Sequence, residues 1–316
     1  MLGRSGNFEG CVLNQEYALI TAARNEQEYI GFPAEAVASQ TVRPRKWVIV
    51  SDGSTDATDQ VVKDYTEKWN FIQFVRGEEG NGRSGFASKV SALNTGYECL
   101  RNTDYDFIGH LDADVSFEPD CYERLLAKFR ENPRLGLAGG FIYESRGGRF
   151  HSRPTNRGRS VAGAVQLFRR KCYEDVGSVV PFTMGGEDAY AEVMARMKGW
   201  HVEAFPDIKI FHHRRSTKAR GVMREFFLYG AMDYALGYHP FFEILKGISR
   251  IKERPPVTAA LLRMSGFVWS YISRRKRPVP AEFIRYVRRE QLELLKTCFH
   301  MARGASGGNR KLSNGP

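Results

Sequence analysis

Short apolar runs alternate with amphipathic segments over the first two thirds of the chain, and this alternation constrains the fold more than any other feature. Tyr17–Ala22, Lys46–Val50 and Asp106–Leu111 are runs of this kind. Strands that are buried on both faces of a parallel sheet have such continuous sequences, because helices cover them on either side. We therefore predict an α/β fold with a mostly parallel sheet flanked by helices.

Changes in composition divide the chain into regions. We expect one α/β domain made of two halves, 15–115 and 116–215, followed by a helical, basic region over 216–301. Residues 302–316 are rich in Gly, Ser and Asn, which predicts a disordered tail. Within the second half, residues 144–159 are rich in Arg, Gly, Ser and Pro, which favours a surface loop.

The positive charge of the chain is concentrated in its last third. From His212 to the C-terminus, 21 Lys and Arg stand against 7 Asp and Glu, a net charge of +14. The other 211 residues carry 26 against 29, a net charge of −3, within a total of +11. A role that depends on binding anions therefore belongs mainly to the C-terminal region.

Aromatic and aliphatic residues lie beside these basic residues. Segments 224–245 and 256–272 are apolar, and a basic cluster, 274–277, follows directly. This combination is typical of helices at an anionic membrane surface. Two alternatives stay open: the helices pack on the first domain, or on a second copy of the chain. The basic residues match no nucleic-acid-binding motif, so we expect no nucleic-acid partner.

Cysteine usage and the apolar segments indicate the compartment. The five cysteines are far apart and include no CxxC pair, so neither a disulfide framework nor a zinc cluster is expected. The N-terminus has no apolar core of a signal peptide. The longest apolar stretch, 257–272, is too short to span a bilayer and contains Arg263. We expect a cytoplasmic protein, peripheral on the inner face of the membrane if the C-terminal helices bind lipid.

Carboxylates follow two of the predicted strands. Asp52 comes shortly after the predicted strand Lys46–Val50, and Asp112 and Asp114 come after the predicted strand Asp106–Leu111. Ligands of open α/β sheets bind at the carboxyl edge of the strands. Asp52 could equally be a helix cap, but Asp112 and Asp114 would repel each other unless a cation lies beside them. Carboxylate oxygens near phosphates suit Mg²⁺ or Mn²⁺, so we predict such a metal site.

The turn after the first strand has no glycine, so the GxGxxG fingerprint of dinucleotide-binding dehydrogenases is missing. Six short motifs nevertheless occur in an order that resembles family-2 glycosyltransferases of the GT-A fold, over about residues 15–215. They are Ala22-Ala23-Arg24-Asn25-Glu26, Val50-Ser51-Asp52-Gly53-Ser54, Lys89 with Ala92-Leu93-Asn94-Thr95-Gly96, Leu111-Asp112-Ala113-Asp114, Gly185-Gly186-Glu187-Asp188 and His212-His213-Arg214.

The resemblance implies a nucleotide-sugar donor at the sheet edge. Ala22, Arg24 and Glu26 would line the nucleoside pocket, and Asp52 would accept hydrogen bonds from the base. Many members have two acidic residues before the Gly-Ser turn; Ser51 replaces the first here, so Asp52 would act alone. The full set of donor-binding residues expected is Ala22, Ala23, Arg24, Glu26, Asp52, Lys89, Asp112, Ala113 and Asp114.

The same resemblance implies a metal and a catalytic base. Asp112 would lie near the ribose and the metal, and Asp114 would bind the Mn²⁺ or Mg²⁺ that holds the diphosphate. The resemblance favours His212 over His213 as a further metal ligand, although the pair could instead be a phosphate-contacting or solvated cluster.

In this resemblance 15–115 would be the nucleotide-sugar-binding half and 116–215 the acceptor half. Gly186 and Glu187 would lie on the acceptor side, and Asp188 would be the general base of an inverting transfer. The alternative for Asp188 is an acid that only complements the helix dipole.

These observations predict a metal-dependent, inverting glycosyltransferase. It would move a sugar from a nucleoside-diphosphate sugar to a hydroxyl of a glycan or polyprenyl-linked glycan, in polysaccharide biosynthesis. The alternative is a non-catalytic protein of the same fold that binds nucleotide sugars or acts as a scaffold. The donor base and sugar, the acceptor, the linkage and the oligomeric state, including a homo-oligomer, stay open.

Overall fold

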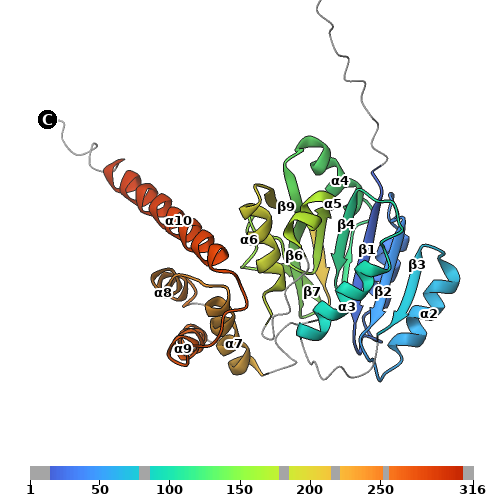
Figure 1. The fold of residues 1–316 in the computed structure, drawn as a ribbon, viewed down its shortest axis with the longest axis horizontal. Helices are drawn as coiled ribbons and strands as arrows, with labels where there is room; N and C mark the ends of the chain where they lie inside the picture. The colour runs from blue at the N-terminus through green and yellow to red at the C-terminus, as the bar shows by residue number, and fades with distance from the viewer. Residues whose placement is uncertain (1–14, 78–85, 178–184, 215–220, 252–255, 309–316) are drawn as a thin grey trace, which may run out of the picture.

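The computed structural model describes residues 15–77, 86–177, 185–214, 221–251 and 256–308. Figure 1 shows two regions: a sheet covered by helices, and a group of helices beside it that ends in the long α10 (Ala281–Gly308). The expected helical C-terminal region is therefore present. Helix α10 continues to Gly308, so helix extends beyond the boundary at 301 that we placed from composition.

One sheet of nine strands forms the first region within the described residues, in the order β3-β2-β1-β4-β8-β6-β9-β5, with β7 paired to β6. The first four strands in this order are parallel, and the rest of the sheet is mixed. The α/β class is confirmed. The strands are β1 (Tyr17–Ala23), β2 (Lys46–Ser51), β3 (Ile72–Arg76), β4 (Phe107–Leu111), β5 (Val115–Phe117), β6 (Leu135–Arg146), β7 (Arg149–Ser152), β8 (Val165–Arg169) and β9 (His201–His212).

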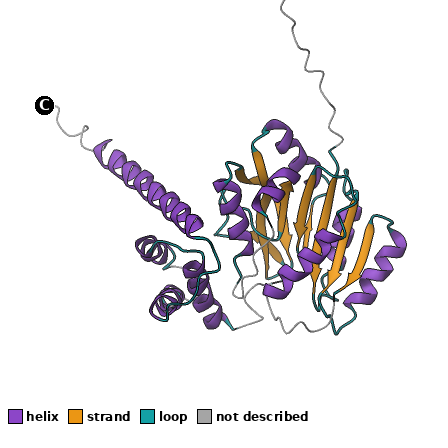
Figure 2. Cartoon of the chain, viewed as in Figure 1, coloured by secondary structure: helices purple, strands orange, loops and turns teal. Residues whose placement is uncertain are grey.

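Helices cover both faces of this sheet, as Figure 2 shows. One apolar core lies between the sheet and α1, α2 and α4; a second lies between the sheet and α3, α5 and α6, and also takes in residues of α7 and α10. The helices are α1 (Gly31–Ala38), α2 (Thr58–Lys68), α3 (Phe86–Glu98), α4 (Cys121–Glu131), α5 (Arg170–Val176), α6 (Glu187–Met197), α7 (Val222–Ala235), α8 (Pro240–Ser249), α9 (Thr258–Ile272) and α10 (Ala281–Gly308).

The central strands explain why the polar residues gather at one edge. Most side chains of β1, β2 and β4 are buried, so these strands show the continuous apolar runs expected of a doubly covered sheet. Their parallel register pairs Ala22 with Val50 and Ile20 with His110. The carboxyl ends of the three strands therefore lie side by side, and the residues that follow them face a common edge.

We predicted a surface loop over residues 144–159, and this prediction is wrong for the first part of that segment. Strand β6 runs on to Arg146 and pairs with β7, so a β-hairpin stands there. Asn156 fixes its base, because its side chain accepts from the N–H of Ile142 (3.1 Å) and donates to the carbonyl of the same residue (2.9 Å). Exposed polar strands lack the apolar signature by which strands are recognised in sequence.

The C-terminal helices pack tightly on one another. Helices α7 and α9 cross at Gly230 and Gly266, where a Cβ on Gly230 would lie 1.8 Å from the carbonyl oxygen of Arg263. Such a close approach requires glycine. Among the described residues, no helix combines the length and apolar content needed to cross a membrane.

Candidate active site

Asp52 lies where β1 and β2 end together. Its backbone N–H donates to the carbonyl of Ala23 (2.8 Å), and Ser88 Oγ donates to its Oδ2. Arg24 Nη1 lies 3.8 Å from the same carboxylate oxygen, and the Arg24 side chain is 51% exposed. Ala22 is half-buried at the end of β1. Of the residues expected to form a nucleoside pocket, Arg24 and Asp52 therefore lie near each other, with Ala22 on the neighbouring strand and Ser88 in contact with Asp52.

Lys89 connects the two halves of the domain. Its Nζ lies 2.8 Å from Asp112 Oδ1, after β4, and 3.7 Å from Glu187 Oε1, at the start of α6. Burial opposes the charge of Lys89, but the carboxylates of Asp112 and Glu187 outweigh it and raise its pKa. Burial raises the pKa of Glu187, and within the described part of the chain Glu187 Oε2 has no hydrogen-bond partner. Ala113, between the two aspartates of this turn, is buried.

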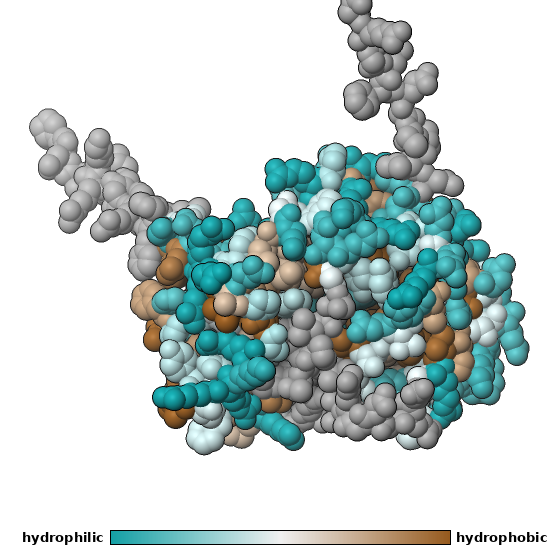
Figure 3. Space-filling view, viewed as in Figure 1, coloured by the Kyte–Doolittle hydropathy of each residue, from teal (hydrophilic) through white to brown (hydrophobic). Residues whose placement is uncertain are grey.

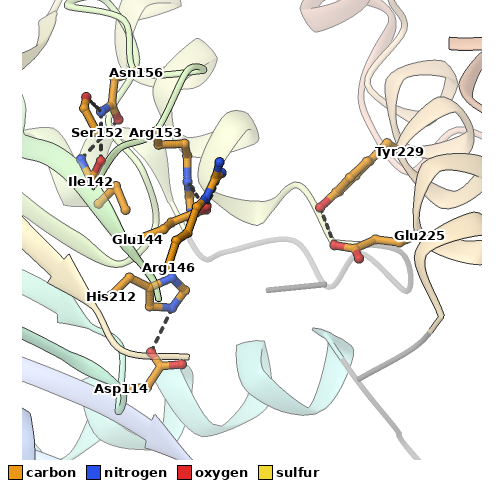
Figure 4. Close-up of polar contacts among 10 residues, drawn as sticks. All are labelled: Asp114, Ile142, Glu144, Arg146, Ser152, Arg153, Asn156, His212, Glu225 and Tyr229. Atoms are coloured by element: carbon orange, nitrogen blue, oxygen red, sulfur yellow. Dashed lines mark hydrogen bonds and ion pairs between the residues drawn. The ribbon is translucent and has the colours of Figure 1, made fainter. Parts of the chain in front are cut away.

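A second cluster of polar side chains surrounds Asp114. Its Oδ1 lies 3.1 Å from His212 Nε2, and its Oδ2 lies 3.6 Å from Arg214 Nε. Arg214 also forms an ion pair with Glu26 and lies over the ring of Tyr29. Glu26, expected in the nucleoside pocket, therefore lies with the residues around Asp114. Figure 4 shows the contact between Asp114 and His212.

The ionisation of this group follows from burial and its neighbours. Burial alone would raise the pKa of Asp114, but the hydrogen bond from His212 and the charges of His212 and Arg214 lower it. The pKa of His212 is raised by Asp114, against the effect of burial. Burial raises the pKa of Glu26 to about 7, although Arg214 opposes the shift. In the ligand-free chain, His212 and Arg214 thus both favour the charged form of the Asp114 carboxyl.

The two adjacent histidines point to different partners. Val115 pairs with His212 in the sheet, which brings His212 next to Asp114. His213 instead lies 2.8 Å from Ser116 Oγ and stacks on Phe32 at 3.7 Å between ring centroids. Side chains alternate between the two faces of a strand, so only one of two neighbours can face Asp114. Of the pair, His212 is the one positioned to share a ligand with Asp114.

Helix α6 begins with the acidic pair. Gly186 caps it with φ +103°, a conformation that favours glycine. Asp188 Oδ1 accepts from the N–H of Ala189 (2.8 Å), and its carboxylate lies against Gly163. Glu187 and Asp188 therefore stand at the positive end of a helix dipole, next to Lys89.

The C-terminal helices hold α6 from outside. Met232 of α7 occupies the space beside Gly186 that a side chain would need. Arg196 binds Glu290 of α10 through Nε (2.7 Å) and Nη2 (3.1 Å), and Tyr190 stacks on Phe283. Helix α6 is thus fixed between the sheet and α7 and α10, which keeps its acidic start in place.

The β6–β7 hairpin and α7 supply further polar side chains nearby. Glu144, paired with His212 in the sheet, accepts from Arg153 Nε (2.8 Å) and Arg146 Nη2 (3.2 Å). Tyr229 of α7 donates to Glu225 (2.5 Å), and Figure 4 shows this pair on the opposite side from the hairpin and His212. Burial raises the pKa of Tyr229, and the charge of Arg153 opposes that shift, so the two sides interact electrostatically.

The expected metal-binding residues are brought together only in part. Asp114 and His212 lie in contact, whereas Asp112 is paired with Lys89. Within the described residues, no three His, Cys, Asp or Glu side chains converge as a complete set of metal ligands.

Sequence reasoning did not single out Ser88, which contacts Asp52, or Glu144, which pairs with His212 in the sheet. Ser88 could have been suspected, because it precedes Lys89 in a recognised motif. Glu144 lies in a segment with no motif, and only the folded chain brings it beside His212.

Comparison with known proteins places the chain among sugar-transferring enzymes. The family model described as Glycosyl transferase family 2 matches residues 18–194. Poly-beta-1,6-N-acetyl-D-glucosamine synthase of Staphylococcus epidermidis is 28% identical over 123 residues, 39% of this chain and 27% of that protein. The synthase of Staphylococcus aureus (strain COL) is 27% identical over 176 residues, 50% of this chain and 40% of that protein. The chain thus spans less than half the length of these curated relatives.

Two solved structures share the fold. The mannosyltransferase PcManGT from Pyrobaculum calidifontis, in complex with GDP-Man and Mn²⁺, aligns with a TM-score of 0.52 at 17% identity over 94% of this chain and 81% of that one. TarS 1-349 of S. aureus, in complex with UDP-GlcNAc, aligns with a TM-score of 0.52 at 15% identity over 82% of this chain and 73% of that one. These likenesses identify the GT-A type of fold.

Proposed function

The chain belongs to glycosyltransferase family 2, and from this premise we propose that it moves a sugar from a nucleoside-diphosphate sugar to a hydroxyl of a glycan or lipid-linked glycan, with inversion at the anomeric carbon. Transfer from a nucleotide sugar is the activity of the family. The acceptor, the divalent cation and the catalytic base are our assignments. The polysaccharide synthases among its relatives and the mannosyltransferase among its structural neighbours suit a glycan acceptor.

The donor would lie along the edge where β1, β2 and β4 end. Asp52 is held by Ser88 and leaves a carboxylate oxygen for the N–H groups of a base, with the half-exposed Arg24 beside it. Lys89 and Arg214 provide positive charge close to Asp112 and Asp114. A diphosphate in this position would accept charge-assisted hydrogen bonds from both side chains.

Asp114 and His212 fit a divalent cation. Asp114 Oδ1 and His212 Nε2 lie 3.1 Å apart, and a carboxylate oxygen and an imidazole nitrogen are side-chain donors that would hold Mn²⁺ or Mg²⁺. Two protein ligands leave positions for diphosphate oxygens and water, as Mg²⁺ and Mn²⁺ require. When bound, the cation would neutralise the charge that develops on the leaving nucleoside diphosphate. Asp112 would stay with Lys89 in this arrangement.

Asp188 is the base we assign. A base must accept the proton of the attacking hydroxyl, on the side opposite the leaving group. Asp188 stands at the acceptor half, where Glu187 already neutralises Lys89 and α7 fixes Gly186.

The observation that carries the proposal is the contact of Lys89 with both Asp112 and Glu187. It joins the donor side to the acceptor side through a single ammonium group. A protein that only binds nucleotide sugars has no need of an acidic pair fixed at this distance from its donor site, so the contact favours an enzyme over the scaffold alternative.

Release of nucleoside diphosphate distinguishes these two functions. The full chain is incubated with Mn²⁺ or Mg²⁺ and a panel of UDP- and GDP-sugars, with and without oligosaccharide acceptors. We expect release from at least one donor, and an acceptor that raises its rate. Binding of a donor without release from any would contradict the enzyme assignment and favour the scaffold.

A further inference from the structure

Exposed hydrophobic side chains are distributed unevenly between the two regions. Among the described residues, the sheet region exposes two large ones, Phe32 and Phe150. The C-terminal helices and their connections expose many more. These are Met223, Phe241, Ile244, Ile248, Ile251, Val257, Leu261, Val268, Trp269, Tyr271, Ile272, Leu292 and Leu294. A contiguous apolar surface of this kind marks a site of interaction with another molecule or a membrane.

Helices α8 and α9 each carry an exposed apolar stripe. On α8 the residues recur three and four positions apart, and on α9 four to seven apart, so each set lies on one face of its helix. The two helices pack against each other, with Met264 Cε 3.8 Å from a Cβ placed on Gly247. We call the two stripes together the outer apolar face; its residues are Phe241, Ile244, Ile248, Leu261, Val268 and Ile272.

The outer apolar face lies at the end of the molecule away from the sheet. Figure 1 shows α8 and α9 beyond α7 on the side opposite β3, and Figure 3 shows hydrophobic surface at this end among hydrophilic side chains. Nothing else in the described part of the chain covers these side chains, which are 43–71% exposed.

Positive charge and aromatic rings stand at the C-terminal end of α9. Arg274 and Lys276 are exposed directly after the helix, and Trp269 and Tyr271 are 55% and 53% exposed in its last turn. Tryptophan and tyrosine rings prefer the headgroup level of a bilayer, and lysine and arginine pair with anionic lipid there.

We propose that the outer apolar face docks on an anionic lipid bilayer, with Leu261 and Ile272 inserted and Arg274 and Lys276 at the headgroups. The chain would lie on the membrane and not span it, as a helix with a charged end and an apolar stripe does. A second copy of the chain fits less well. The one acidic residue of α8 and α9, Glu243, is buried, so this face of a second copy would offer no acidic partner to the exposed Arg274 and Lys276.

Flotation of the full chain with vesicles tests this docking. Vesicles of phosphatidylcholine alone and with about 40% phosphatidylglycerol are compared at low and high salt. We expect flotation with the anionic vesicles at low salt and a marked reduction at high salt, because the Debye length shortens. No flotation with anionic vesicles at low salt would overturn the proposal.

Paired variants locate the docking residues. Leu261→Ser with Ile272→Ser should lower the floating fraction at least about tenfold, because two large apolar side chains no longer enter the bilayer. Leu292→Ser with Leu294→Ser, on α10, removes the same number of exposed leucine-sized side chains and should leave flotation unchanged. An equal loss in both pairs would overturn the assignment to α8 and α9.

Charge reversal and chain mass complete the test. Arg274→Glu with Lys276→Glu should abolish the preference for anionic vesicles, whereas Lys68→Glu with Arg101→Glu, the same charge change in the sheet region, should keep it.

Light scattering of the unliganded chain tests the second-copy alternative. A dimer that Leu261→Ser with Ile272→Ser converts to a monomer, while flotation persists, would overturn the proposal.

Discussion

The sheet region and the C-terminal helices both bury charged side chains, but they use them differently. At the sheet edge, Glu187, His212 and Arg214 each keep a buried polar atom with no hydrogen-bond partner among the residues that the structure describes, next to half-exposed residues such as Arg24. In the helices, Asp233 is fully buried between Lys246 and Arg263. Buried charge alone therefore does not mark a site. Unpartnered polar atoms do not distinguish the two regions either, because both carboxylate oxygens of Glu243 in the helices lack a hydrogen-bond partner among the described residues. Buried charge marks a site where the side chains border an accessible edge.

Replacing Asp233 should have the largest effect, and on stability. Asp233 accepts from Lys246 Nζ at 2.9 Å and from Arg263 Nε and Nη2 at 2.9 and 2.7 Å. Asp233→Asn leaves both cations buried with only Glu243, so we expect a loss of about 3–5 kcal/mol in the free energy of unfolding. Thermal and denaturant unfolding measure this.

The exposed ion pair of Asp207 with Arg124 offers the matched control. Asp207→Asn should change stability by less than about 1 kcal/mol, as expected for a surface pair. Similar losses in the two variants would show that the charges within the helices do not hold them together.

Asp188→Asn should leave stability nearly unchanged and remove activity. Loss of a general base lowers the rate of transfer by about a hundredfold or more, equal to about 2.7 kcal/mol in the barrier. Donor affinity, measured by calorimetry, should stay within about twofold. Asp207→Asn, in the same half of the domain, should retain the full rate. Near-normal turnover of Asp188→Asn would remove it as the base.

Lys89→Met separates the two sides of the site. Without the ammonium group, Asp112 and Glu187 lose their shared cation and repel the donor diphosphate, so we expect donor affinity to fall about tenfold. Arg101→Met, on a surface pair with Glu98, is the control. Unchanged donor affinity in Lys89→Met would mean that Lys89 does not face the diphosphate.

The smallest effect that we expect is on the pH dependence of stability, and it concerns the buried charges of the C-terminal helices. Burial raises the pKa of Glu243 from 4.5 to about 7. Between pH 4.5 and about 7, the folded chain therefore binds more protons than the unfolded chain. The free energy of unfolding consequently falls as pH rises through about 7.

Glu243→Gln lacks this titration. The Tm of the wild-type chain should therefore fall a few degrees more than that of Glu243→Gln on going from about pH 5 to about pH 8. The exposed Glu293→Gln should follow the wild type. Equal pH profiles for Glu243→Gln and the wild type would contradict the raised pKa.

Much of the sheet could be predicted from sequence, because its central strands are buried on both faces and their apolar runs are continuous. The same rule placed Asp52, Asp112 and Asp114 at one edge, where the structure has them. The β6–β7 hairpin was misjudged because its exposed strands are Arg- and Gly-rich.

Contacts between distant segments could not be predicted at all. Lys89 and Glu187 are 98 residues apart in the chain, and no local pattern reports that their side chains meet. The same holds for Met232 against Gly186 and for Asp233 between α8 and α9. Composition also gave no sign that the fold gathers four charged residues of 216–301 in one cluster. Asp233, Glu243 and Arg263 are buried there, and the Lys246 side chain is 14% exposed.

The central claim is that the sheet edge holds a nucleotide sugar through a divalent cation at Asp114 and His212. Calorimetric titration of the wild type, Asp114→Asn and Asp207→Asn with UDP- and GDP-sugars, each with and without Mn²⁺, tests it most directly. We expect Mn²⁺ to strengthen donor binding at least about tenfold in the wild type and in Asp207→Asn. In Asp114→Asn, we expect Mn²⁺ to leave donor binding unchanged. An equal Mn²⁺ effect in all three proteins would contradict the claim.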